Sequence, residues 1–89
     1  NVLYEHPAVM DAAAFGRPHP TLGEEPAAAV ALKPGTSVSE TELQTFAGAR
    51  LAAYKCPVRI LILEDLLPRN PNGKILKDRL QQMLATEKV

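Results

Sequence analysis

Apolar residues recur at helical spacing in two stretches of the second half of the chain. The first stripe comprises Leu43, Phe46, Ala47, Leu51 and Tyr54, and the second comprises Leu76, Leu80, Met83 and Leu84. Before the first stripe, the Ser39 hydroxyl can accept the amide of Glu42, whose carboxylate reaches back in a capping box. We therefore predict one helix that starts at Ser39 in a region ended by Pro57, and a last helix from about Ile75.

Shorter apolar runs predict three strands. Residues 8–16 and 26–33 are bounded by proline and glycine, and their length suits strands although alanine alone would favour helix. We expect these two strands to pair antiparallel, with the turn-rich residues 17–25 as a broad loop between them. Residues 58–64 are β-branched and apolar on both faces, which is typical of a strand inside a sheet covered on both sides. Residues 1–6 indicate the last turns of a helix that Pro7 ends.

The predicted order of helix, strand, strand, helix, strand and helix indicates a small α+β domain. Its three-stranded sheet would contain the antiparallel hairpin and one central strand, with helices on both faces. A chain of 89 residues, 46% hydrophobic and 22% charged, has room for one such domain. No apolar run approaches the length of a transmembrane segment. A single cysteine excludes an internal disulfide, so we expect a reducing cytoplasm.

Charge is distributed unevenly along a chain whose formal net charge is zero. Residues 1–53 carry three basic and six acidic side chains, whereas residues 54–89 carry seven basic and four acidic ones. The positive charge gathers at Arg69, Lys74, Lys77 and Arg79. This cluster indicates either a bound anion on that side or a solvated helix face.

Most reactive side chains form no pattern for catalysis or metal binding. His6 and His19 have no partner cysteine, so we expect no metal site. The adjacent Glu24 and Glu25 are better explained as solvated carboxylates than as a general acid and base. Cys56 has no neighbouring histidine pattern, which favours a buried or tolerated thiol over a nucleophile.

The loop of residues 70–74 ends in the pair Gly73-Lys74. Gly73 allows backbone conformations that other residues avoid, and it can bring the Lys74 tip forward. The segment is not a nucleotide P-loop, which would need glycine in place of Pro68 and serine or threonine in place of Ile75. From spacing alone, a helix entrance is a more frequent explanation than catalysis.

Four segments form a series along nearly the whole chain. They are His6-Pro7-Ala8-Val9, Gly23-Glu24-Glu25-Pro26, residues 51–57 with the letters YKCP, and residues 67–80 with the letters PRNPNGKI. In sequence and order they resemble the C-terminal part of the adenylate-forming superfamily, which comprises acyl-CoA synthetases, adenylation domains of nonribosomal peptide synthetases and luciferases. PRNPNGKI after YKCP is most similar to fatty-acyl and related carboxylate–CoA ligases.

The resemblance implies that residues 1–89 are the small C-terminal subdomain, a mobile lid, of an AMP-forming acyl-CoA synthetase. The large N-terminal domain and the hinge would lie outside this chain. Such a parent is an ATP-dependent acid–thiol ligase that uses ATP, Mg²⁺ and coenzyme A on a fatty or similarly apolar acid. The acid attacks the α-phosphate of ATP to give acyl-adenylate and pyrophosphate; the lid then rotates, and coenzyme A takes the acyl group. The isolated chain is expected to hold no bound cofactor and to be inactive.

Lys74 aligns with the lysine that bridges substrate carboxylate and phosphate oxygens in the first step, so the resemblance implies that it is catalytic. The physics agrees, because a lysine ammonium is a compact charge on a flexible stem. Between Pro57 and Pro68 the chain has one residue more than is usual in the family. A bulge could absorb this residue, which bears on the reach of Lys74.

The other assigned residues are implied by the same motifs. The face toward coenzyme A would carry Tyr54, Lys55, Cys56 and Arg59. Packing in the core is the alternative for Tyr54, and packing along a strand edge is the alternative for Arg59. Arg69 and Gly73 would support the Lys74 loop, with a contact to the large domain as the alternative for Arg69.

Three other functions are open at this point. Within the family, the chain could be the lid of a peptide-synthetase adenylation domain or of an aryl-CoA ligase. From another class, it could be a stand-alone module that binds phosphate or nucleic acid through its basic C-terminal helix, although zero net charge and 4% aromatic residues count against this. The third is a purely structural domain. The expected partners are the large domain and a carboxylic acid, without nucleic acid, in the cytoplasm or in peripheral contact with a membrane through the large domain.

Overall fold

The computed structural model describes residues 2–19, 21, 23–63 and 67–86, apart from the side chains of His19, Tyr54 and Thr86. Its elements in chain order are the 3-10 helix η1 (Val2–Glu5), strands β1 (Val9–His19) and β2 (Gly23–Leu32), helix α1 (Glu40–Gly48), the 3-10 helix η2 (Ala53–Lys55), strand β3 (Arg59–Leu63) and helix α2 (Lys77–Thr86). The predicted α+β class is confirmed. The predicted element order also holds, with η2 as an addition.

The three strands form one mixed sheet in the order β1-β2-β3. Strands β1 and β2 are antiparallel, and β2 and β3 are parallel with Ala29 opposite Leu61. The central strand is therefore β2, and the prediction that residues 58–64 form the central strand is wrong. Strand β3 is apolar on both faces because a helical layer covers each face of the sheet. Ile60 packs on the side of α1 and Leu61 on the side of α2. The same pattern does not require a neighbouring strand on each edge of β3.

The hairpin is longer than predicted, because most of residues 17–25 belongs to β1 and β2 instead of a broad loop. The prolines that suggested a loop lie where a strand tolerates them. Pro18 is in an edge strand, and Pro26 lies one residue before Ala27, the first residue of β2 paired with β3. The antiparallel pairing itself is confirmed. Glycine at residue 23 accommodates a positive φ of 83° where the second strand begins.

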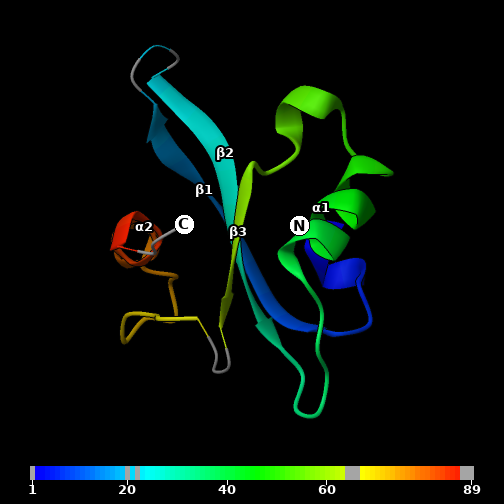
Figure 1. Ribbon diagram of the computed structural model, residues 1–89. Helices are drawn as coiled ribbons and strands as arrows, with labels where there is room; N and C mark the ends of the chain where they lie inside the picture. Colours follow the sequence, from blue (N-terminus) through cyan, green and yellow to red (C-terminus); the bar gives the residue numbers. More distant parts are fainter. Residues whose placement is uncertain (1, 20, 22, 64–66, 87–89) are drawn as a thin grey trace.

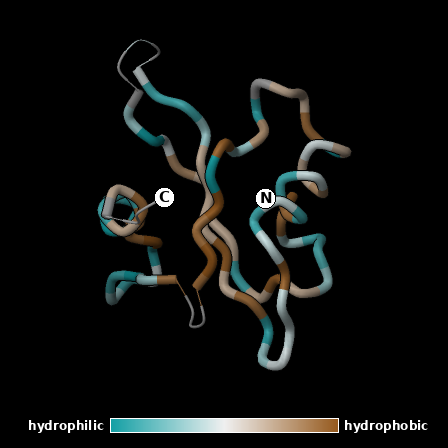
Figure 2. Tube along the Cα trace, in the orientation of Figure 1, coloured by the Kyte–Doolittle hydropathy of each residue, from teal (hydrophilic) through white to brown (hydrophobic). Residues whose placement is uncertain are grey.

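The sheet lies between two helical layers, with α1 and η1 on one face and α2 on the other (Figure 1). The α1 face buries Leu3, Val9, Ala12, Ala28, Val30, Val38, Leu43, Ala47 and Ile60. The α2 face buries Ala13, Phe15, Ala27, Ala29, Ala31, Leu61, Leu67, Leu80 and Leu84. Residues of β2 alternate between the two clusters, which explains why this alanine-rich strand is buried from Ala27 to Ala31. Figure 2 shows hydrophobic residues concentrated in the middle of the sheet, whereas the far end of the hairpin is hydrophilic.

The start of α1 agrees with the prediction, whereas the other helix boundaries differ from it. The Ser39 hydroxyl oxygen accepts a hydrogen bond from Glu42 N at 3.1 Å, which confirms the predicted N-cap of α1. The helix ends at Gly48, well before Pro57. At the N-terminus, the expected helical turns are a four-residue 3-10 helix. Helix α2 begins at Lys77 because Ile75 is paired with Arg69. No helix among the described residues is long and apolar enough to cross a membrane.

Candidate functional site: the Lys74 turn and its anchor

The segment between β3 and α2 folds into a tight turn, which we call the Lys74 turn (residues 69–75). Arg69 and Ile75 form an isolated antiparallel bridge at its base. Inside this bridge, Asn70 N donates to the Lys74 carbonyl at 2.9 Å, and Gly73 N donates to the Asn70 carbonyl at 2.9 Å. The backbone of Lys74 is therefore fixed relative to the base of the turn.

Two side-chain features explain why this sequence turns here. The Asn70 Oδ1 atom accepts hydrogen bonds from the backbone N–H groups of Asn72 and Lys74, both at 3.0 Å. Gly73 has a φ of 84°, a conformation that glycine adopts without steric cost. An asparagine that bonds its own backbone and a glycine at a left-handed position together form the turn.

The turn presents Lys74 to solvent at one end of the molecule, beside the start of α2 (Figure 1). The residue is exposed, and within the described part of the chain no hydrogen bond or ion pair engages its ammonium group. Lys77 and Arg79, on the first turn of α2, are exposed as well. The site is thus a cationic tip on a fixed backbone, which suits an anionic oxygen supplied from outside the domain.

A buried carboxylate, that of Asp11 in β1, holds the Lys74 turn to the sheet. Asp11 is 3% exposed. Its Oδ2 atom accepts from Arg69 Nη1 at 2.6 Å and from Leu67 N at 3.3 Å, and its Oδ1 atom accepts from Arg69 Nη2 at 2.8 Å. A bidentate pair of this kind fixes orientation as well as distance. Arg69 therefore connects the base of the turn to β1.

The Asp11 contacts shift the acid–base equilibria of both partners. The hydrogen bond from Arg69 is the main cause that holds the pKa of Asp11 far below its ordinary value, against burial, which raises it. Hydrogen bonds from the Tyr4 hydroxyl and Leu67 N act in the same direction as Arg69. The hydrogen bond to Asp11 in turn raises the pKa of Arg69. The pair is fully ionised at neutral pH.

Sequence reasoning missed Asp11, although a signal was present. It is the one charged residue in the apolar run of residues 8–16, and it lies in a strand that is otherwise alanine, valine, methionine and phenylalanine up to Gly16. A lone carboxylate in such a strand must find a partner, because burying an unpaired charge is costly. The sequence could not identify Arg69 as that partner, since the two residues are 58 positions apart.

The residues predicted for the coenzyme A side lie in a separate place, from η2 to the first residue of β3. The Arg59 Nε atom donates to Glu40 Oε2 at 2.9 Å, so this guanidinium joins β3 to the start of α1. The Cys56 Sγ atom lies 3.5 Å from the Ala52 carbonyl oxygen, in a sulfur–oxygen hydrogen bond. Lys55 is exposed at the end of η2. The side chain of Tyr54 is outside the described part of the chain, so its predicted place stays a prediction.

The two groups of predicted residues are not brought together. Lys55, Cys56 and Arg59 come at the beginning of β3, and the Lys74 turn follows after its end (Figure 1). The extra residue predicted between Pro57 and Pro68 falls around residues 64–67, of which 64–66 lie outside the described residues. The bulge that could absorb it therefore stays a prediction, and the register shift in β1, between Val9 and Asp11, is a separate feature.

Of the remaining candidates, Glu25 and His6 have structural contacts. Glu25 forms an ion pair with Arg17 at 3.7 Å, and Glu24 is exposed. The His6 Nδ1 atom accepts from Ala8 N at 3.1 Å. Across the described ranges, no group of three His, Cys, Asp or Glu side chains could hold a metal ion.

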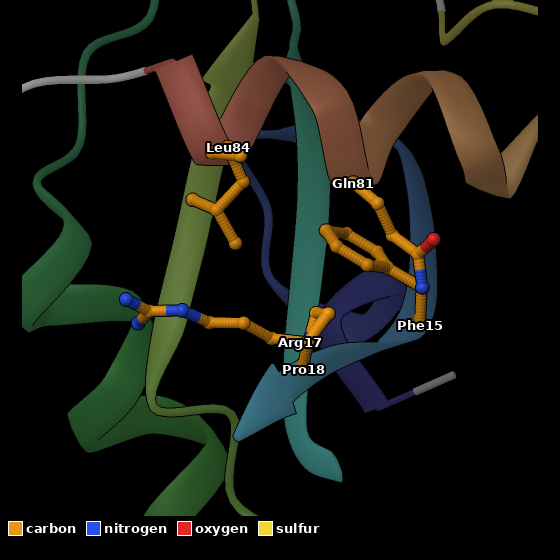
Figure 3. A pocket seen from close by; sticks show the side chains of 6 residues that line it. Phe15, Arg17, Pro18, Gln81 and Leu84 are labelled. Atoms are coloured by element: carbon orange, nitrogen blue, oxygen red, sulfur yellow. The ribbon is translucent and has the colours of Figure 1, made fainter. Parts of the chain in front are cut away.

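A cavity of about 310 Å³ lies between the hairpin and the second half of α2 (Figure 3). It is lined by Phe15, Arg17, Pro18, Gln81, Leu84 and Ala85. Gln81 and Leu84 point from α2 toward the strands in Figure 3, and Gln81 Nε2 donates to the Gly16 carbonyl at 2.6 Å. None of the lining residues was predicted for the site, and the Lys74 turn does not line the cavity.

Comparison with known proteins identifies the domain type. Residues 1–74 match the family model described as AMP-binding enzyme C-terminal domain. The chain is 42% identical over 80 residues to the putative acyl-CoA synthetase YngI of Bacillus subtilis, covering 90% of this chain and 14% of that protein. It is 38% identical over 94 residues to the peroxisomal benzoate–CoA ligase of Arabidopsis thaliana, covering 93% of this chain and 16% of that protein.

A solved structure gives the same answer in three dimensions. The apo structure of MatB from Rhodopseudomonas palustris matches 96% of this chain and 17% of its own with a TM-score of 0.85 at 29% identity. The chain thus spans about one sixth of the length of the proteins it matches. Since the family model extends over most of the chain and the fold agrees with that structure, this chain belongs to the AMP-binding enzyme C-terminal domain family.

Proposed function

We propose that this chain is the mobile C-terminal lid of a larger AMP-forming carboxylate–CoA ligase and that Lys74 acts in acyl-adenylate formation. The observation that carries the proposal is the exposed Lys74 on a turn whose backbone is fixed by Asn70 and by the Arg69–Asp11 pair. The family membership supports it, as do relatives named as acyl-CoA synthetase and benzoate–CoA ligase. That the chain spans about one sixth of those relatives supports a large domain as its partner.

In the proposed first step, a carboxylate oxygen of the acid attacks the α-phosphorus of ATP. The P–O bond to the β-phosphate breaks, pyrophosphate leaves, and acyl-adenylate forms. The Lys74 ammonium would lie against the carboxylate and phosphate oxygens and neutralise their charge in the transition state. Mg²⁺ would be bound by ATP phosphates and the large domain, because the described residues do not form a cluster that could hold a metal ion.

In the proposed second step, the thiol of coenzyme A attacks the acyl carbon and releases AMP. The lid would first rotate and present the region of Tyr54, Lys55, Cys56 and Arg59. The separation of this region from the Lys74 turn, at opposite ends of β3, supports the use of two different faces. The pair with Glu40 uses the Nε atom of Arg59, so a direct contact with coenzyme A would have to be made through its Nη atoms.

The acid is proposed to be a fatty or similarly apolar carboxylic acid. The relatives support acyl and aromatic acids alike, since their names include both acyl-CoA synthetase and benzoate–CoA ligase. Within the basic cluster of Arg69, Lys74, Lys77 and Arg79, Arg69 is paired with Asp11 inside the domain, which leaves one cation fewer for the alternative of phosphate or nucleic-acid binding. A cytoplasmic location stays a prediction from the single cysteine.

The test uses the full-length parent with ATP, Mg²⁺, coenzyme A and a panel of fatty, short-chain and aromatic acids. We expect AMP, pyrophosphate and the acyl-CoA thioester in equal amounts with at least one acid, and no product from the isolated 89-residue chain. Acyl-adenylate without transfer to coenzyme A would favour a peptide-synthetase adenylation domain. Absence of acid-dependent AMP with every acid, or release of ADP, would contradict the proposal.

A further inference from the structure

We propose that Asp11 is a positioning residue for Lys74, which it orients through Arg69; this inference rests on the proposed function. Asp11 is not in the turn and does not reach the reacting atoms. It acts on the turn from the edge strand β1.

Donors from three separate segments converge on the Asp11 carboxylate. Arg69 donates twice, and Leu67 N donates from the same loop. Tyr4 of η1 donates its hydroxyl proton to Oδ1 at 2.6 Å, and Ala12 N donates to Oδ1 at 3.1 Å. Because both oxygens are occupied and the group is buried, the carboxylate has little freedom to change orientation.

An irregularity in the backbone of β1 orients the Asp11 side chain. The register between β1 and β2 shifts between Val9 and Asp11, where Val9 pairs with Leu32 and Asp11 with Ala31. Such a bulge bends a strand and re-aims the side chains beside it. Asp11 is thus directed at the loop by a local irregularity in an otherwise regular hairpin.

Arg69 transmits this position to Lys74. It is one of the two residues of the bridge at the base of the Lys74 turn, opposite Ile75, and Lys74 directly precedes Ile75. The Asn70 side chain also stabilises the turn, because its Oδ1 atom accepts a hydrogen bond from Lys74 N. Because the lysine stem itself is flexible, the placement of its backbone sets the region that the ammonium can reach.

Stability alone is a weak reason for a buried ion pair. Replacing such a pair by apolar residues is often neutral or stabilising, because desolvation offsets much of the attraction. The Arg69–Asp11 pair lies at the base of an exposed turn, where it can hold the turn, and with it Lys74, in one orientation. Rates of positioned reactions are sensitive to displacements of about 1 Å.

The experiment compares Asp11→Asn with wild type in the full-length parent. The substitution keeps the shape of the side chain, and Arg69, whose side chain is 32% exposed, can be hydrated when it loses its partner. We expect the rate of acyl-adenylate formation to fall on the order of 10- to 100-fold. Thioester formation from supplied acyl-adenylate should be unchanged, since a change confined to the turn does not touch the other face.

Matched variants separate positioning from stability. Glu25→Gln removes the other acid–arginine pair of the hairpin, that with Arg17, and should leave both half-reactions unchanged. Asp11→Asn and Arg69→Gln remove the same link, so the double variant should lose little more than Arg69→Gln alone. Should Asp11→Asn fail to fold, Tyr4→Phe removes one bond to the carboxylate from a half-exposed residue and should give a smaller loss of the same step.

Two outcomes overturn the inference and leave the proposed function standing. In one, Lys74→Ala slows acyl-adenylate formation, but folded Asp11→Asn does not. In the other, Asp11→Asn slows both half-reactions equally, which is the result of a purely structural role. If Lys74→Ala also leaves acyl-adenylate formation unchanged, the proposed function itself is wrong.

Discussion

At the scale of single residues, the fold strongly controls the ionisation of Asp11. Its carboxylate is buried at the edge strand and accepts two hydrogen bonds from Arg69. These contacts favour the charged form in the folded state, whereas the unfolded chain returns the group to its ordinary pKa of about 3.9. The folded and unfolded states therefore bind protons differently in acid.

We predict that the free energy of unfolding of the chain falls in acid because Asp11 takes up a proton. A depressed pKa contributes stability that is fully present above about pH 5 and is lost as the pH falls below the ordinary value and toward the folded-state pKa. Each unit of depression is worth about 1.4 kcal/mol. Urea unfolding followed at pH 7, 5, 4 and 3 should show this loss in wild type and a flatter profile in Asp11→Asn. Parallel profiles for the two proteins would contradict the prediction.

Residues with local roles could be predicted from the sequence, and residues with distant partners could not. Ser39 caps a helix that begins at the next residue, and Gly73 adopts the positive φ of a turn, so a few neighbouring letters suffice for both. Asp11 and Arg69 depend on the folding of β1 against the loop, 58 positions away. The roles of Lys74 and of the residues at positions 54–59 come from the family resemblance and stay predictions.

At the scale of elements, the Lys74 turn and the end of α1 each contain a glycine whose surroundings are open. A Cβ atom at Gly73 or Gly48 would meet no other atom within 4 Å. The two positions differ in backbone conformation, because Gly73 has a positive φ and Gly48 lies at the end of a regular helix. Any difference between their alanine variants therefore reports backbone strain and propensity, not packing.

We predict opposite effects of alanine at these two glycines. Gly73→Ala should lower the free energy of unfolding by about 1 kcal/mol, since an L-residue is strained at that φ. Gly48→Ala should raise it by about 0.5–1 kcal/mol, because alanine is the better helix former and restricts the unfolded chain. Chemical denaturation of the two variants beside wild type measures both effects. A neutral or stabilising Gly73→Ala would show that the turn does not depend on its left-handed glycine.

Element positions were harder to predict than element types. The runs of alanine and valine between prolines correctly predict two strands. Pro18 and Pro26 suggest a loop but lie within the strands, so the hairpin is longer than predicted. The sequence of β3 suggests a central strand because it is apolar on both faces, which helices cover. In the sheet, however, β3 is an edge strand that pairs with β2. An edge strand and a central strand have the same hydrophobic pattern when helices cover both faces of the sheet. The pattern alone therefore cannot distinguish the two positions.

At the scale of the whole molecule, one three-stranded sheet separates the two regions for which we propose functions. The region of residues 54–59 lies at the start of β3, on the side of α1, and the Lys74 turn lies beyond its end, next to α2 (Figure 1). The central strand contributes residues to the core of both helical faces, which joins the two layers into one body. A lid built in this way could exchange one region for the other by rotating as a unit. We therefore expect substitutions in the two regions to affect different half-reactions.

The central claim is that the Lys74 ammonium acts in acyl-adenylate formation. The most direct measurement is the single-turnover rate of pyrophosphate release by the full-length parent carrying Lys74→Ala, with Lys77→Ala, another exposed lysine nearby, as the control. We predict a loss on the order of 10²–10³ for Lys74→Ala, as for other well-placed groups that stabilise transition-state charge, and none for Lys77→Ala. Thioester formation from supplied acyl-adenylate should be unchanged in both. A Lys74→Ala enzyme that releases pyrophosphate at the wild-type rate would contradict the account.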